Sequence, residues 1–125
     1  MKTKIIATAQ DFARKHNFSF ELYEFKKNQL WGETDKNESK NWAKFEMNPG
    51  FYVISNKTNV VYIGKSITNT GGRLFLHFQN DEKMRHCDEN TDIIVFSFLV
   101  DRHFTSALES FLIEEFKTIE NKKIG

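Results

Sequence analysis

The chain has 125 residues, a length that supports one compact domain and leaves little room for a second independent core. Its composition is 39% hydrophobic and includes 13 phenylalanines, which is typical of a folded protein and argues against intrinsic disorder. The formal net charge of +1 at pH 7 is low for a protein that holds a polyanion, so a nucleic-acid surface would need its basic residues gathered on one face.

Two features of the sequence bear on where the protein works. No apolar run approaches the roughly 20 residues of a membrane span, and the N-terminal residues lack the apolar stretch of a signal peptide. The single cysteine, Cys87, has no partner for an internal disulfide, which fits a reducing compartment. We therefore expect a cytoplasmic protein with no membrane partner.

The N-terminal part of the chain predicts a helix followed by a strand. Residues 5–16 carry apolar side chains at helical spacing, and Asn17 is placed to end that helix. Residues 18–22 alternate apolar and polar side chains as a half-buried strand does, until Tyr23 and Phe25 shift the phase. This pattern indicates a helix-strand extension before the main domain.

The chain becomes polar over residues 26–48, which we expect to form a loop or arm. Before Asn48 there are nine basic and seven acidic residues, whereas nine basic and ten acidic residues follow it. We predict two parts, an N-terminal extension over residues 1–48 that packs on the core and a main domain over residues 49–125. The extension carries the positive charge balance.

A β-hairpin is predicted directly after this boundary. Pro49 cannot donate to a sheet ladder and marks the entry to a new element. Residues 51–55 and 60–64 have strand composition, and the polar residues 56–59 between them tolerate the left-handed geometry of tight turns. The two runs are therefore expected to pair antiparallel.

The rest of the chain predicts a helix, a strand and a second helix. Residues 73–78 have apolar side chains at helical spacing, and the polar residues 79–91 are expected to form a loop. Residues 93–100 are rich in β-branched and aromatic side chains, and residues 104–119 carry an apolar stripe. The order after the extension is β, β, α, β, α.

Arg73 and His77 are candidates for phosphate chemistry. They lie one helical turn apart and therefore share a helix face. A guanidinium can bind a phosphate through two parallel hydrogen bonds, and an imidazole can donate or accept a proton near neutral pH. The alternative is that both belong to an ordinary solvated helix face.

Glu109 permits two interpretations. Ser106 and Glu109 fit a capping box, in which the glutamate closes the start of a helix. If the helix instead begins near Asp101 or Phe104, Glu109 lies inside it and can hold one divalent cation. Mg²⁺ prefers oxygen ligands and keeps several waters, so one carboxylate with substrate phosphate oxygens is a sufficient site.

Several short motifs occur in a fixed order along the chain. Gly50-Phe51-Tyr52 and Tyr62-Ile63-Gly64 lie on the two predicted strands of the hairpin, and they are followed by Arg73 and His77, Leu108-Glu109, Leu112-Ile113 and Asn121. This series resembles the GIY-YIG nucleases, with phenylalanine in place of isoleucine in the first motif. The resemblance spans about Gly50 to Asn121.

The resemblance implies a small α/β (α+β) domain, with a small central antiparallel sheet flanked by helices. It implies that Tyr52 and Tyr62 line the active site, one of them as general base, together with Arg73, His77 and Glu109. It also implies substrate contacts from Lys65, Gly64 and Asn121. The chain departs from the family pattern before Asn121, where a proline and an aromatic are usual, and at Glu114, where a basic residue is common.

The function implied is a divalent-metal-dependent endonuclease that hydrolyses phosphodiester bonds in DNA, with Mg²⁺ or Mn²⁺ held by Glu109. A catalytically weak or inactive module that binds nucleic acid or a partner protein is the first alternative, and an RNA-directed nuclease is the second. Target recognition would come from residues 1–48, the 79–91 loop, a homodimer or a partner subunit.

Overall fold

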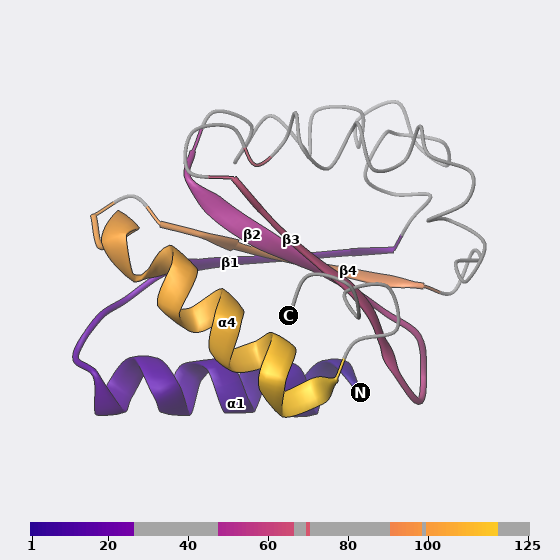
Figure 1. Ribbon diagram of the computed structural model, residues 1–125. Coiled ribbons are helices and arrows are strands. Elements are labelled where there is room, and N and C mark those ends of the chain that lie inside the picture. Colours follow the sequence, from indigo (N-terminus) through magenta and orange to yellow (C-terminus); the bar gives the residue numbers. More distant parts are fainter. Residues whose placement is uncertain (27–47, 67–69, 71–90, 99, 118–125) are drawn as a thin grey trace.

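The structure is a computed structural model that describes residues 1–26, 48–66, 70, 91–98 and 100–117 (Figure 1). In this part of the chain four strands form one antiparallel sheet in the order β1-β4-β2-β3, and two helices lie on the same side of it. The predicted α+β fold is confirmed. The elements are α1 (Lys2–Lys15), β1 (Glu21–Lys26), β2 (Gly50–Ser55), β3 (Val60–Ser66), β4 (Asp92–Ser97), the 3₁₀ turn η3 (Arg102–Phe104) and α4 (Thr105–Phe116).

Helix α1 forms where the apolar spacing predicts it and ends where Asn17 was expected to end it. The helix buries Ile5, Ala9 and Ala13 against the rest of the protein. Asn17 has a φ of 55°, a left-handed conformation that asparagine tolerates better than most residues. The chain can therefore turn sharply from α1 towards the sheet.

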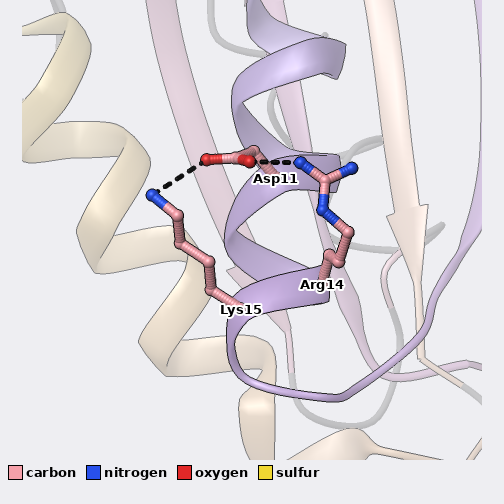
Figure 2. Close-up of polar contacts among 3 residues, drawn as sticks. All are labelled: Asp11, Arg14 and Lys15. Atoms are coloured by element: carbon pink, nitrogen blue, oxygen red, sulfur yellow. Dashed lines mark hydrogen bonds and ion pairs between the residues drawn. The ribbon is translucent and has the colours of Figure 1, made fainter.

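The last turns of α1 carry a small cluster of charges on the outside of the protein. The Asp11 carboxylate accepts hydrogen bonds from Arg14 and from Lys15, whose Nζ lies 3.1 Å from Asp11 Oδ2 (Figure 2). The hydrogen bond from Lys15 is the main cause that lowers the pKa of Asp11 below its ordinary value. The two basic residues also complement the negative end of the helix dipole.

Strand β1 carries apolar side chains on both faces, which explains the shift of phase in its sequence. Leu22 packs with the residues between the sheet and the helices, whereas Tyr23 and Phe25 pack with the residues on the opposite face. The strand begins at Glu21 rather than at Phe18, because Phe18 stacks on Phe104 at a centroid distance of 4.4 Å before the sheet starts.

The N-terminal extension contributes a strand to the same sheet as the main domain. β1 pairs antiparallel with β4 from Glu21 opposite Ser97 to Lys26 opposite Asp92. The backbone N–H of Ser19 donates to Asp101 Oδ2 at 2.9 Å, which ties the start of the strand to the chain before α4. The first 26 residues are thus built into the sheet and its core.

The predicted hairpin is present as β2 and β3. Asn56 organises its turn, since its Oδ1 accepts from the backbone N–H groups of Thr58 at 3.0 Å and Asn59 at 2.7 Å. The turn uses no left-handed residue, because Asn17 and Lys117 are the only non-glycine residues with positive φ in the described part of the chain. The predicted turn is therefore present, and an asparagine side chain holds it without left-handed backbone.

The sheet separates two clusters of buried side chains. On the helix side, Phe51 stacks on Phe96 at 4.7 Å, and Phe12 of α1 stacks on Phe111 of α4 at 4.4 Å. On the opposite face, the buried side chains are those of Tyr52, Ile54, Val61, Tyr62, Ile93 and Val95. Alternate residues along the strands therefore lie in different surroundings, except at the irregularity in β3, where the neighbours Val61 and Tyr62 share one cluster. This alternation decides where the site residues lie.

None of the described helices is long and apolar enough to cross a membrane.

Candidate active site

The glycine of the first motif lies where two backbones approach closely. A Cβ on Gly50 would lie 2.1 Å from the carbonyl oxygen of Phe96, on the neighbouring strand β4. A backbone carbonyl held in a sheet cannot move away, so no larger residue fits here. Gly50 therefore sets the contact between β2 and β4 just before Tyr52.

The glycine of the second motif serves the tyrosine of the first. Gly64 on β3 lies directly opposite Tyr52 on β2. A Cβ on Gly64 would lie 2.5 Å from both Cζ and Oη of Tyr52, and 2.7 Å from Cε1 of Tyr62. The phenol of Tyr52 thus lies across Gly64, and any larger residue here would have to displace the tyrosine rings.

The two motif tyrosines lie together on the sheet face opposite the helices. Their ring centroids are 6.0 Å apart and their planes meet at 33°. Both side chains belong to the same buried cluster, with only 1% of Tyr52 and 2% of Tyr62 exposed. We call Tyr52, Tyr62 and Gly64 the tyrosine face.

Lys65 lies on the other face of β3. Its cross-strand partner is Phe51, which packs between the sheet and the helices, so the Lys65 side chain extends towards α4. Lys65 Nζ donates to Ser106 Oγ at 3.0 Å and lies 3.9 Å from Glu109 Oε1. One third of the Lys65 side chain and 14% of the Glu109 side chain are exposed. We call Lys65, Ser106 and Glu109 the polar triad.

Glu109 lies inside α4 and not in a capping box. The helix begins at Thr105 with Phe104 in the N-cap position, and no side chain caps it. The hydroxyl of Ser106 accepts from Lys65, and the hydroxyl of Thr105 donates to the Arg102 carbonyl at 2.7 Å. The capping-box interpretation is wrong because the helix starts earlier than Ser106.

The tyrosine face and the polar triad meet at β3. This strand lies at one edge of the described sheet, so side chains on both of its faces have access to the same edge. Gly64 and Lys65 are neighbours on it and point to opposite faces. The structure therefore brings Tyr52, Tyr62 and Gly64 together, and Lys65 and Glu109 together, on the two sides of one strand.

Three predicted site residues, Arg73, His77 and Asn121, lie outside the described residues, as does Cys87. The nearest described residue before Arg73 in the sequence is Thr70. Its backbone N–H and its hydroxyl donate to the Asn48 carbonyl at 3.1 Å and 2.8 Å. Thr70 is buried and is thus fixed beside the start of β2.

Ser106 is a site residue that the sequence did not assign. Its spacing of three residues before Glu109 places both on one side of α4. The spacing of Ser106 and Glu109 was visible in the sequence, but the same spacing also fits a capping box. The contact with Lys65 joins residues 41 positions apart, and local patterns do not report such contacts.

Comparison with known proteins identifies the family. The family model for the GIY-YIG catalytic domain matches residues 48–123. The chain belongs to the GIY-YIG family. The resemblance drawn from its motifs is thereby confirmed, although a search of curated proteins finds no match.

Two solved structures share the fold of this GIY-YIG protein. Both are of the GIY-YIG N-terminal endonuclease domain of UvrC from Thermotoga maritima, each a tyrosine-to-phenylalanine mutant bound to its catalytic divalent cation. One has a TM-score of 0.52 and 22% identity, and the other has 0.51 and 25%. Each match covers 69% of this chain and 96% of that domain.

Proposed function

We propose that this protein is a divalent-metal-dependent endonuclease that hydrolyses phosphodiester bonds in DNA. The observation that carries the proposal is the pair formed by Lys65 and Glu109, at 3.9 Å, across the contact between β3 and α4. A carboxylate and an ammonium lie side by side on the edge strand that also carries Gly64 and Tyr62. Because the chain belongs to the GIY-YIG family, we interpret this arrangement as part of a nuclease site.

Glu109 would hold the metal. Its carboxylate is largely buried next to β3, and carboxylate oxygens are the ligands that a hard divalent cation prefers. One carboxylate is enough for Mg²⁺ or Mn²⁺ when waters and substrate phosphate oxygens complete the shell. The similar UvrC domain is bound to a catalytic divalent cation, which supports the assignment. Such a cation polarises a phosphoryl oxygen and stabilises the charge that develops there.

The remaining roles follow from the chemistry of each side chain. A hydroxyl of the tyrosine face, from Tyr52 or Tyr62, acts as general base towards the attacking water. Lys65 places a positive charge at the scissile phosphate. Arg73 stabilises the transition state and His77 transfers a proton, while Gly64 and Asn121 contact the substrate.

We further propose that the protein acts in the cytoplasm.

We also propose that residues 1–48 supply most of the substrate contacts, alone, in a homodimer or with a partner subunit. The motivation for this second proposal is the positive charge balance of the segment, with nine basic and seven acidic residues before Asn48. In this proposal the division at Asn48 is one of function, since β1 shares the sheet with the main domain.

One observation favours a second function, a binding module without strong catalysis. The chain after Asn48 has nine basic and ten acidic residues, and Glu114 and Glu115 are exposed on α4, the helix that carries Glu109. Exposed acidic residues repel a phosphate backbone and reduce the affinity for it.

Cleavage assays with the purified protein distinguish these functions. Supercoiled plasmid and a short RNA are each incubated with the protein, with Mg²⁺, with Mn²⁺ and with excess chelator. We expect plasmid nicking that needs the metal. Cleavage of RNA alone would make the protein an RNA-directed nuclease, and binding without cleavage under every condition would make it a binding module.

A further inference from the structure

The polar triad holds a lysine beside a carboxylate without a hydrogen bond between them. Lys65 Nζ lies 3.9 Å from Glu109 Oε1, which is too far for a hydrogen bond, whereas it lies 3.0 Å from Ser106 Oγ. The ammonium therefore donates to the hydroxyl and stays near the carboxylate without direct contact. Because its donor is ionised, the hydrogen bond to Ser106 is charge-assisted and is suited to hold the ammonium in place.

Helix α4 presents two acceptors to this lysine. Ser106 and Glu109 are three residues apart on the helix and share one side of it, next to β3. Of the two, Ser106 lies nearer to the Lys65 ammonium, at 3.0 Å against 3.9 Å. Removal of its hydroxyl would leave Glu109 as the nearest acceptor from α4 for that ammonium.

We propose that Ser106 is a positioning residue, which keeps the Lys65 ammonium beside Glu109 but out of direct contact with it. Lysine and a divalent cation compete for the same carboxylate, since both are attracted to its oxygens. By accepting from Lys65, Ser106 leaves Glu109 a better metal ligand. This inference rests on the proposed role of Glu109 as the metal ligand.

The test is direct Mn²⁺ binding, measured from the electron paramagnetic resonance signal of free Mn²⁺ without any substrate. In Ser106→Ala the ammonium closes on Glu109 and must be displaced by the metal. Partly exposed ion pairs are weak, so we expect the Mn²⁺ dissociation constant to rise roughly two- to fivefold. Ser106→Thr keeps a hydroxyl and should retain the wild-type constant.

The lysine provides the decisive control. Lys65→Met removes the competing charge and should tighten Mn²⁺ binding. In that background Ser106→Ala should have no further effect, because there is no ammonium left to position. If Ser106 only supported the helix, its removal would weaken binding equally in both backgrounds, and that result would overturn the inference.

A matched control on the same helix is Ser110→Ala, an exposed serine one turn further on, which should leave the dissociation constant unchanged. The two proposals also fail in different ways. Wild-type protein that binds no Mn²⁺, or binds it equally in Glu109→Gln, would remove the metal site itself. Wild-type binding that depends on Glu109 but not on Ser106 would remove only the positioning role.

Discussion

The tyrosine face and the polar triad lie on the two sides of β3 and are built in different ways. The tyrosine face is formed within one hairpin, where Tyr52 lies opposite Gly64, and its side chains are almost fully buried. The polar triad joins a strand to a helix 41 residues away and stays partly open to solvent. One region is fixed by local packing and the other by a long-range contact between charges.

These two ways of building a region match two different requirements of a nuclease site. A base must be held in one position, which close packing achieves, and a metal ligand must remain accessible to ions and to phosphate. We expect substitutions in the polar triad to change chemistry more than stability, and substitutions of the motif glycines to do the reverse. The predictions below test this expectation from the largest effect to the smallest.

The largest effect is expected for Glu109→Gln, which keeps the shape of the side chain and removes its charge. Loss of the metal costs several kcal/mol of transition-state stabilisation, so we expect plasmid nicking to fall by about 10³-fold or more. The melting temperature should change little. Glu114→Gln, at an exposed position on the same helix, is the control and should not lower the rate of cutting.

Tyr52→Phe and Tyr62→Phe test whether the tyrosine face takes part in the chemistry. Each change removes one oxygen and keeps the ring that packs in the cluster. If one hydroxyl is the general base, its loss should lower the rate by about 10²- to 10⁴-fold, as is usual for such groups. The cleavage rate is measured in single-turnover experiments with prebound substrate. Wild-type rates in both variants would show that the tyrosine hydroxyls contribute to packing and not to the chemistry.

Gly64→Ala and Gly50→Ala should act on stability. The new Cβ at Gly64 meets the side chain of Tyr52, which can give way, and we expect a loss of about 1–3 kcal/mol in the free energy of unfolding. The new Cβ at Gly50 meets the backbone oxygen of Phe96, which cannot, so that loss should be the larger. Urea unfolding followed by circular dichroism measures both, and the reverse order would contradict the geometry.

The smallest effect is expected at Asp11, a residue of α1 that belongs neither to the tyrosine face nor to the polar triad. Its pKa is lowered in the folded state, mainly by the hydrogen bond from Lys15, so its contribution to stability is present above its ordinary pKa of 3.8. That contribution is lost as the pH falls through the lower folded value. Asp11→Asn should therefore melt slightly below wild type at pH 6, with the difference shrinking below pH 4, while nicking stays unchanged. A difference that does not shrink as the pH falls would show that these contacts of Asp11 are not its cause.

The sequence predicted the local elements because their signals are local. The apolar spacing of α1, the turn at Asn56 and the composition of β2, β3 and β4 each specify a short piece of structure, and all are present. The motif order predicted the family, and the position of Glu109 within α4 followed from an early helix start.

The sequence could not predict how distant pieces meet. That β1 pairs with β4 depends on a contact between residues 21–26 and 92–97, which no periodicity encodes. The hydrogen bond from Lys65 to Ser106 is hidden for the same reason. The sequence shows that the apolar side chains of β1 shift from one face to the other. Only the neighbouring elements reveal that both faces of the strand pack against other residues.

The order of the strands has a consequence for how the chain folds during synthesis. β4 is the last of the described strands in the sequence, yet it lies between β1 and β2 in the sheet. Until residues 92–97 leave the ribosome, β1 lacks its described partner strand and the β2 edge of the β2–β3 hairpin is uncovered, and exposed strand edges favour aggregation. The tyrosine face can form early, but the polar triad must wait for α4. A chain interrupted before β4 would therefore carry its tyrosines without Glu109, the proposed metal ligand, and we expect it not to cut.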